Sequence, residues 1–420
     1  MAFAITSPPH TAREQGPARD HGRSSDATGV AADWLTSIRG QNAGIHQTSP
    51  AAAVAEEVVA DWLLELLDLP RASSVGFVTG ATMASFVGLA AARTQVLADA
   101  GHDFEAYGLQ GAPRVQVFLS DDAHVANRSA LRYLGFGAAN VTEIPSDDRG
   151  LMEVCALAEA LQAHVGPKII IAQAGHINSG GFEDLPGIVA SARKHGAWVH
   201  VDGAFGLWAL LLPEKAALTA GLDEADSWSV DGHKWLQLPY DSGFAIIRHP
   251  DAHRRAMDMT AGYLNHGPED GRNPTHFVPE LSRRARGFAA WAVLRRWGRH
   301  GIAGMVRRHC AAAERLAARL ERIGGLEVLN PVVLNQVLVG AGPGRDADAI
   351  VELADALNAS GVFVRTAQWK GRGVLRFSVI SSDVGPDDAD RVADVIEEVW
   401  PRRAGRATRG HEERSLGAQA

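Results

Sequence analysis

The chain has little cysteine, no long apolar run and no excess of positive charge. Its 420 residues include two cysteines, Cys155 and Cys310, which excludes a disulfide scaffold or a cysteine-rich zinc site and suits a reducing cytoplasm. No run of about 18 apolar residues occurs, so no membrane span is expected. The N-terminus lacks a basic stretch followed by an apolar core, which argues against a secretory signal. The formal net charge of −8 favours no nucleic-acid partner.

The remaining composition is that of a soluble globular enzyme, with 46% hydrophobic and 21% charged residues. A chain of this length is expected to form one large domain and a smaller one. Residues 1–28 and 402–420 are polar and rich in glycine and arginine, so both are predicted to be disordered, with ordering in an oligomer as the alternative. Between them we expect an N-terminal segment and large domain over 29–295 and a small α+β domain over 296–401.

Short apolar segments alternate with helical segments along the large domain. Strands are predicted at 75–78, 115–120, 140–145, 168–173, 198–201 and 243–248. Such alternation is typical of a mostly parallel sheet with helices on both faces, in which ligands bind beyond the carboxyl ends of the strands. Four polar residues, Thr79, His124, His176 and Asp202, follow predicted strands at that edge.

A strand-end acid and a downstream lysine give the main chemical signal. Asp202 ends an apolar run, and Lys234 lies between His233 and Trp235. Pyridoxal phosphate (PLP) chemistry needs such a pair, because a lysine amine forms a Schiff base with the cofactor and a carboxylate keeps its pyridine nitrogen protonated. The rival lysines Lys215 and Lys370 have no histidine before them and are interpreted as surface charges.

A turn of small residues is a candidate site for the phosphate. Gly80, Ala81 and Thr82 join the strand at 75–78 to a predicted helix. Small residues let backbone N–H groups approach an anion, and the start of a helix adds the positive end of its dipole. The turn alone is weak support, and its position ahead of Asp202 and Lys234 strengthens it.

Several segments together resemble one family of enzymes. They are SP-x-x-x-x-x-E, TGATMAS, DDAHVANRSAL, HVDGAFG, ADSWSVDGHKW and VLRFSV. In this order they resemble the group II PLP-dependent decarboxylases, which include aromatic amino acid and glutamate decarboxylases, and the shorter bacterial members above all. The resemblance covers roughly residues 45–400. It implies an α/β fold of the PLP-dependent transferase type (fold type I), with a large, mostly parallel, seven-stranded sheet domain and a small C-terminal α+β domain. It also implies a homodimer with active sites at the interface.

The resemblance implies a role for each matching residue. Lys234 would form the Schiff base, Asp202 would pair with the pyridine nitrogen, and His124 would stack on the ring and assist proton transfer. The residues expected to hold the cofactor are Gly80, Ala81, Thr82, His124, His176, Asp202, Ala204, Ser229, His233 and Lys234. Within this set, the phosphate contacts are expected from Gly80, Ala81, Thr82, Ser229 and His233. Arg376 is a candidate for binding the substrate carboxylate.

Four of these residues have a simpler structural interpretation. His124 could cap the helix that follows it, and His233 could serve packing alone. Ser229 could form a loop hydrogen bond, and Arg376 could belong to a structural ion pair. These alternatives stay open at the level of sequence.

The chain departs from the family at the group that reprotonates the product. In these decarboxylases a loop tyrosine does so after CO2 leaves, and its place here falls at about Pro274. Tyr263 and His276, on the same irregular loop, are candidates to take its place and to bind the substrate, although neither matches the family's motif. Losing that tyrosine favours reaction with oxygen and an aldehyde product in the family. We therefore expect decarboxylation of a small-molecule L-amino acid, with oxidative deamination to an aldehyde, lyase or aminotransferase chemistry as alternatives. A non-catalytic regulator is disfavoured because no helix-turn-helix is present.

Overall fold

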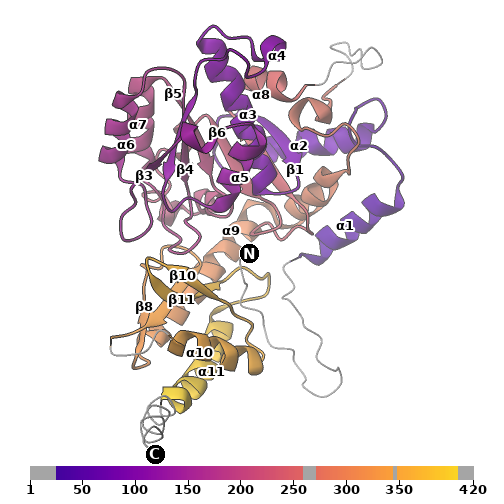
Figure 1. Cartoon of the computed structure of the whole chain (residues 1–420). Coiled ribbons are helices and arrows are strands. Elements are labelled where there is room, and N and C mark those ends of the chain that lie inside the picture. Colours follow the sequence, from indigo (N-terminus) through magenta and orange to yellow (C-terminus); the bar gives the residue numbers. More distant parts are fainter. Residues whose placement is uncertain (1–24, 259–270, 344–347, 405–420) are drawn as a thin grey trace, which may run out of the picture. The chain divides into compact units, whose positions relative to one another are not determined.

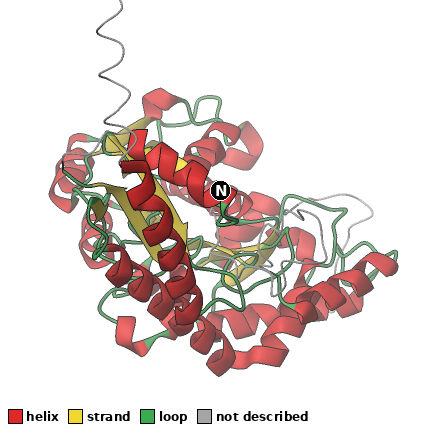
Figure 2. Ribbon diagram, turned by 90° about the horizontal axis from the view of Figure 1, so that it is seen from below, coloured by secondary structure: helices red, strands yellow, loops and turns green. Residues whose placement is uncertain are grey.

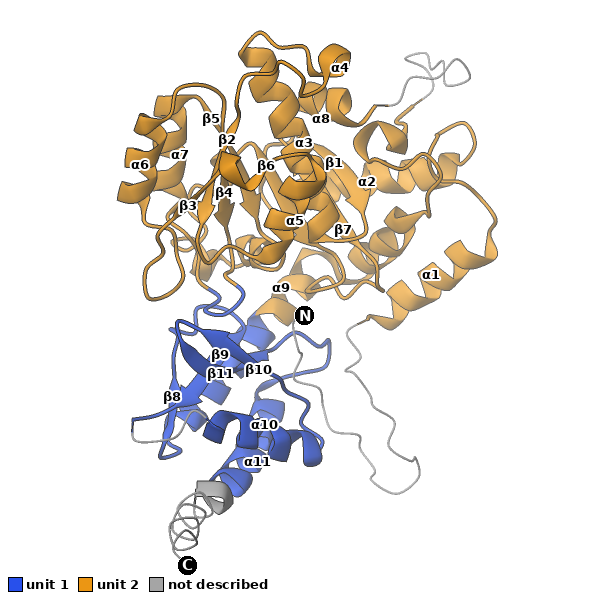
Figure 3. Ribbon diagram, viewed as in Figure 1, with its two compact units in different colours: residues 1–23, 177–180, 307–420 blue, residues 24–176, 181–306 orange. Residues whose placement is uncertain are grey.

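The computed structural model describes residues 25–258, 271–343 and 348–404, with side chains as far as residue 400. These residues form two compact units, which Figure 3 shows in different colours. The large unit contains residues 25–176 and 181–306, and the small unit contains 177–180 and the described residues from 307 onward. Within these ranges no helix has the length and apolar character needed to cross a membrane.

The large unit is built on a seven-stranded sheet (Figure 1). Its strands are β1 (Ser74–Val78), β2 (Gln116–Ser120), β3 (Val141–Ile144), β4 (Lys168–Gln173), β5 (Ala197–Asp202), β6 (Ser227–Asp231) and β7 (Gly243–Ile247). They lie in the order β1-β7-β6-β5-β4-β2-β3. Pairing is parallel from β6 through β3, whereas β7 runs antiparallel to both β6 and β1. The predicted mostly parallel, seven-stranded α/β sheet is confirmed.

The central strands are apolar because helices cover both of their faces. β2, β4, β6 and β7 are buried along their whole length, as expected for strands of a doubly covered sheet. Six strands lie where the sequence pattern predicts them. The seventh, β6, begins at Ser227 in a segment for which no strand was predicted, because its text, SWSVD, mixes polar and apolar residues.

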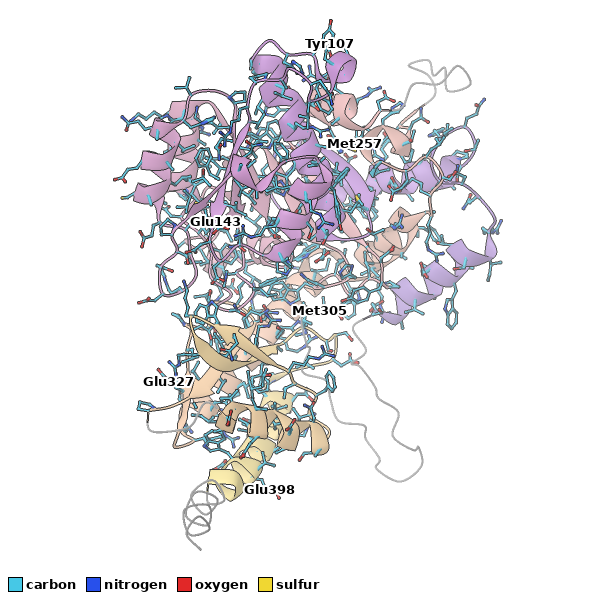
Figure 4. All side chains as sticks on the ribbon, in the orientation of Figure 1. Tyr107, Glu143, Met257, Met305, Glu327 and Glu398 are labelled. Atoms are coloured by element: carbon cyan, nitrogen blue, oxygen red, sulfur yellow. The ribbon has the colours of Figure 1, made fainter. Side chains whose placement is uncertain are left out.

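Helices flank the strands in the ribbon views of Figures 1 and 2. Those of the large unit are α1 (Ala27–Ile38), α2 (Pro50–Leu66), α3 (Ala81–Asp99), α4 (Phe104–Tyr107), α5 (Val125–Tyr133), α6 (Val154–Ala163), α7 (Leu185–His195) and α8 (Pro250–Met257). α3 packs on β5, β6 and β7, and α7 packs on β4 and β5. α1 begins inside the segment expected to be an arm, and Tyr107 projects from α4 (Figure 4).

A buried ion cluster fastens α2 to the edge strand β1. Glu56 is 1% exposed and lies 2.5 Å from Nη1 of Arg283 and 3.3 Å from Nη1 of Arg272. The two guanidinium groups also donate to backbone carbonyl groups of Phe77 and Val75, in β1. Since β1 leads directly into the turn at Gly80, this cluster fixes the strand that carries the turn.

The small unit has a separate antiparallel sheet and its own core. Its strands are β8 (Leu326–Val328), β9 (Gln336–Ala341), β10 (Thr366–Trp369) and β11 (Arg372–Ser378), in the order β10-β11-β9-β8. The helices α10 (Asp348–Ala359) and α11 (Pro386–Ala404) bury Leu353, Leu357 and Ile396 in the core of this unit. The expected small α+β domain is confirmed.

The long helix α9 (Arg286–Leu320) breaks at Gly298. This glycine has φ 54° and ψ −175°, a conformation that residues with a Cβ rarely adopt. The glycine at this position therefore permits the break, which divides α9 into two helical segments.

Candidate active site

Three polar side chains form a row at the carboxyl edge of the large sheet. Gln173, Asp202 and Ser229 are register partners on β4, β5 and β6. Asp231 ends β6 two residues further on, and Lys234 follows it. The edge at which ligands bind in such sheets thus carries the predicted acid and lysine together.

Asp202 is a buried carboxylate held by hydrogen bonds. It is 8% exposed, and its Oδ2 accepts a bond of 2.8 Å from Nδ2 of Asn127. Its Oδ1 accepts a bond of 3.2 Å from the backbone N–H of Ala204, whose side chain is half-buried. Among the residues that the structure describes, no cation forms an ion pair with Asp202. A buried anion with hydrogen-bond donors and no ion-pair partner is suited to a cationic ring nitrogen.

Lys234 extends its amine to a second buried carboxylate. Its Nζ lies 2.9 Å from Oδ2 of Asp231, and the lysine side chain is 20% exposed. The same Nζ lies 5.7 Å from the centre of the Phe205 ring. The amine is therefore reachable from solvent but held at the strand ends by an ion pair.

The turn predicted to bind the phosphate, Gly80–Thr82, is occupied by the carboxylate of Asp231. Oδ1 of Asp231 accepts a bond of 2.6 Å from the backbone N–H of Ala81, at the start of α3. Gly80 must lack a side chain, because a Cβ there would lie 2.9 Å from Cε1 of His233 and 3.1 Å from Asp231. Thr82 is exposed in the first turn of α3. The turn therefore binds an anionic group, here one supplied by the chain.

His233 lies beside Asp231 and stacks on an aromatic side chain. Its Nδ1 accepts a bond of 3.2 Å from the N–H of Ser242, so Nε2 carries the proton, and Nε2 lies 3.3 Å from Asp231. Burial lowers the pKa of His233, although Asp231 opposes the shift. Its ring stacks on Tyr240, with centroids 4.1 Å apart. Asp231 and Tyr240 were missed from the sequence; the available signal for Asp231 was its position three residues before the lysine.

His124 begins α5 and caps it. Its Nδ1 accepts a bond of 3.3 Å from the N–H of Ala126, and its own N–H donates to Oε1 of Gln173 at 3.2 Å. His124 therefore caps α5, as its simpler structural interpretation predicts. Stacking on the cofactor remains a prediction, which capping does not oppose, since the half-buried imidazole lies at the same sheet edge.

Ser229 lies in a buried network beneath α3. Its Oγ accepts a bond of 3.1 Å from Ser85, whose Oγ lies 3.3 Å from Nε2 of His200. Burial lowers the pKa of His200 to about 4, so this imidazole is neutral near pH 7. Ser229 and Asp231 point to the same face of β6, and Asp231 is the one that reaches the turn. Asp231, rather than Ser229, therefore reaches the turn predicted to bind the phosphate, and the phosphate contact of Ser229 stays a prediction.

Two further predicted residues are held by neighbouring acids. His176 is fully buried, and its Nε2 lies 3.2 Å from Oδ2 of Asp122. His276 is in the short 3-10 helix Pro274–Phe277, with Nε2 3.6 Å from Oδ1 of Asp258. Tyr263 lies outside the described residues.

Arg376 belongs to the small unit, on β11. Its Nη1 lies 3.3 Å from Oδ1 of Asn178, and burial lowers its pKa. Its role toward a substrate carboxylate stays a prediction. In the described ranges no group of His, Cys, Asp and Glu side chains is arranged to hold a metal ion.

Comparison with known proteins gives one consistent result. The family model described as "Pyridoxal-dependent decarboxylase conserved domain" matches residues 20–339. Tryptophan decarboxylase 1 of Oryza sativa subsp. japonica is 31% identical over 391 residues, covering 85% of this chain and 75% of that one. Aromatic-L-amino-acid decarboxylase of Mus musculus is 27% identical and covers 80% and 72%. The solved structure of Oryza sativa TDC with PLP and tryptamine superposes with a TM-score of 0.84 at 25% identity, over 91% of this chain and 82% of that one.

The fold and the sheet edge define an α/β enzyme of the PLP-dependent class, in which a lysine amine, a buried acid and an anion-binding helix start meet. The chain belongs to the pyridoxal-dependent decarboxylase family. Its cofactor is pyridoxal 5′-phosphate, and its reaction is the decarboxylation of an amino acid.

The residues present fit this cofactor. Lys234 would supply the amine for covalent attachment, Asp202 the buried anion for the pyridinium, and the Ala81 N–H, which here donates to Asp231, a donor for the phosphate. When bound, PLP supplies a protonated ring that takes up the electron pair of a bond broken at the substrate Cα. Asn127 and the backbone of Ala204 keep the Asp202 carboxylate oriented at the strand end.

Proposed function

We propose that the chain decarboxylates an aromatic L-amino acid on PLP attached through Lys234. The observation that carries this proposal is the juxtaposition of Lys234 and buried Asp202 at one sheet edge. The aromatic substrate class is supported by relatives whose names specify tryptophan and aromatic L-amino acids. In this assignment His124 faces the ring, while Ala81 and His233 contact the phosphate.

A substrate panel tests the reaction. The purified protein with PLP is incubated with L-tryptophan, L-tyrosine, L-phenylalanine, L-glutamate and L-aspartate, and CO2 and amine are measured. We expect release from the aromatic substrates, and loss of release in Lys234→Ala. Lys370→Ala removes an exposed lysine and serves as the control. Release of CO2 from the acidic substrates alone would overturn the substrate class, and none from any substrate would overturn the function.

An aldehyde-forming reaction is the second candidate. Pro274, which is buried, occupies the approximate place of the family's loop tyrosine and offers no proton. Phenylacetaldehyde synthase of Arabidopsis thaliana is 27% identical to this chain and covers 79% of it and 71% of its own length. Assaying aldehyde, ammonia and hydrogen peroxide in the same reactions separates the two candidates, because simple decarboxylation yields none of them.

The proposed assembly is a homodimer with its active sites at the interface. It is supported by α1, where Trp34 is 67% exposed, Leu35 53% and Ile38 77%. An apolar hollow of roughly 280 Å³ adjoins this face, lined partly by Leu35 and Phe288. Exposed apolar groups gathered in this way mark interaction surfaces. Sedimentation velocity should give a dimer for the wild type and a monomer for Trp34→Glu, and a wild-type monomer at micromolar concentration would contradict the proposal.

Two narrower proposals concern location and substrate binding. A cytoplasmic location is supported by Cys155 and Cys310, which form no disulfide, and is tested by cell fractionation. Arg376 is assigned to the substrate carboxylate, so Arg376→Gln should raise KM more than it lowers kcat. An unchanged KM would leave Arg376 as a structural residue.

A further inference from the structure

The first turn of α5 joins the active site through two side chains. His124 caps the helix and faces the end of β4, where its N–H donates to Gln173. Asn127, one turn later, is fully buried and donates from Nδ2 to Oδ2 of Asp202 at 2.8 Å. One short segment therefore contains the predicted ring-facing histidine and also binds the acid assigned to the pyridine nitrogen.

The negative charge of Asp202 rests on few donors. In the part of the chain that the structure describes, its hydrogen-bond partners are the Asn127 amide at 2.8 Å and the backbone N–H of Ala204 at 3.2 Å. The titratable side chains of Glu183 and His200, near Asp202, supply no positive charge that would stabilise its carboxylate. Burial raises the pKa of nearby Glu183 to about 7, with Asp202 contributing to the shift, and burial keeps His200 neutral. Asn127 thus supplies the shorter of two bonds that stabilise this anion.

The amide of Asn127 is poorly explained as a packing residue. Its Oδ1 is buried and accepts no hydrogen bond from any residue that the structure describes. A buried amide with an unsatisfied oxygen is less favourable for folding than an apolar side chain of the same shape. What the amide provides instead is a donor that keeps its proton at every physiological pH and points at Asp202.

We propose that Asn127 is a positioning residue of the decarboxylase, which holds the Asp202 carboxylate in place and turned toward the pyridine nitrogen of the cofactor. This inference rests on the proposed role of Asp202. Because a hydrogen bond from an amide to a charged group is among the stronger ones, its loss should reach the cofactor through Asp202. Asn127 itself has no contact with the reacting atoms in this assignment.

Two nearly isosteric variants separate this role from packing. Asn127→Leu removes the donor without adding charge, and Asn127→Asp replaces it with a carboxylate that donates only while protonated. The matched control is Asn335, an equally buried asparagine of the small unit, whose Nδ2 donates to the carbonyl group of Val379 and whose Oδ1 also lacks a partner among the described residues. Its replacement by leucine tests the cost of losing a buried amide as such.

PLP is titrated into each full-length apoprotein at pH 6 and at pH 8. The absorbance of the lysine-bound cofactor reports binding and gives the dissociation constant. Asn127→Leu should weaken binding roughly 10- to 100-fold relative to the wild type at both pH values. Asn127→Asp should weaken it at least as much at pH 8 and recover toward the wild type at pH 6, where the pair of carboxyl groups shares a proton. Asn335→Leu should leave PLP affinity unchanged.

Other groups that titrate near Asp202 are common to all variants. They are Glu183 beyond β4, His200 on β5 and His124 on α5. Taking the ratio of the Asn127→Asp and Asn127→Leu dissociation constants at each pH cancels their effect. A ratio that does not change between pH 6 and pH 8 overturns the proposal, and so does wild-type affinity in both variants.

A double-mutant cycle ties the effect to Asp202. In an Asp202→Asn background, Asn127→Leu should cause no further loss of PLP affinity, and an undiminished loss there overturns the proposal. Failure of the proposed function gives a different result, because the wild type would then form no absorbance band that depends on Lys234. If Asn127→Leu does not fold, the pH dependence of Asn127→Asp still decides the question.

Discussion

The carboxylate of Asp231 lies 2.6 Å from the backbone nitrogen of Ala81, whose N–H it accepts. Its other oxygen lies 2.9 Å from the amine of Lys234. One buried side chain therefore connects the helix start assigned to the cofactor phosphate with the lysine assigned to its aldehyde carbon. Any anion that binds at this turn has to share it with Asp231 or displace it.

Asp231→Asn should strengthen the binding of PLP and of inorganic phosphate by about tenfold, because a negative charge beside the phosphate position is removed. Calorimetric titration of the apoprotein with phosphate and absorbance titration with PLP measure this. Asp241→Asn, which removes the more exposed carboxylate paired with Arg286, is the control. Weaker PLP binding in Asp231→Asn would mean that the carboxylate organises His233 and Lys234 rather than competing with the phosphate.

Glu183→Gln should make the apoprotein more stable than the wild type at high pH. Burial raises the pKa of Glu183 from 4.5 to about 7, so its contribution to stability is present below pH 4.5 and is lost as pH rises through 7. Between pH 5 and pH 8 the wild type should lose up to about 3 kcal/mol of unfolding free energy relative to the variant. Urea unfolding at both pH values measures this, with exposed Glu159→Gln as a control that should show no difference.

His253 should make the fold sensitive to acid. It is fully buried, bonded to Ser74 Oγ and the carbonyl group of Phe277, and burial lowers its pKa from 6.5 to about 3. The unfolded chain therefore binds a proton below pH 6.5 that the folded chain does not, and stability falls as pH drops. At pH 4.5 this costs about 2–3 kcal/mol relative to pH 7. His253→Gln should remove that difference in unfolding experiments, whereas exposed His300→Gln should leave it in place.

Glu56→Gln should be strongly destabilising. The change removes the buried ion-pair partner of the guanidinium groups of Arg283 and Arg272, and such losses cost about 3–5 kcal/mol. Glu57→Gln alters the neighbouring exposed carboxylate and should change the unfolding free energy by less than about 0.5 kcal/mol. Equal effects of the two substitutions in urea unfolding would show that the cluster adds nothing beyond surface charge.

The architecture of the large unit could be predicted because its strands are apolar on both faces and end in recognisable polar residues. Asp202 after β5 and the Gly80–Thr82 turn after β1 are such cases. Lys234 could be identified from its neighbours His233 and Trp235. The same periodicity gave no strand for β6, where Ser227 and Ser229 point into a buried hydrogen-bonded network with His200.

What the sequence could not provide is the set of contacts made across the fold. Asp231 reaches Ala81 over a separation of 150 residues, and Asn127 reaches Asp202 over 75. Neither pairing follows from local periodicity, because each depends on how strands distant in sequence line up in the sheet. Tyr240 was missed for the same reason, since its stacking on His233 follows from the path of the chain after β6.

The first turn of α5 also limits how this part of the gene can change. His124 and Asn127 are one helical turn apart, and each meets a different strand end. Inserting or deleting one residue between them would rotate one side chain by about 100° relative to the other, since an α-helix has 3.6 residues per turn. The two groups could then not both keep their partners. A single substitution in this turn alters one of these groups, whereas a change in its length separates the predicted ring-facing histidine from the support of Asp202 in one step.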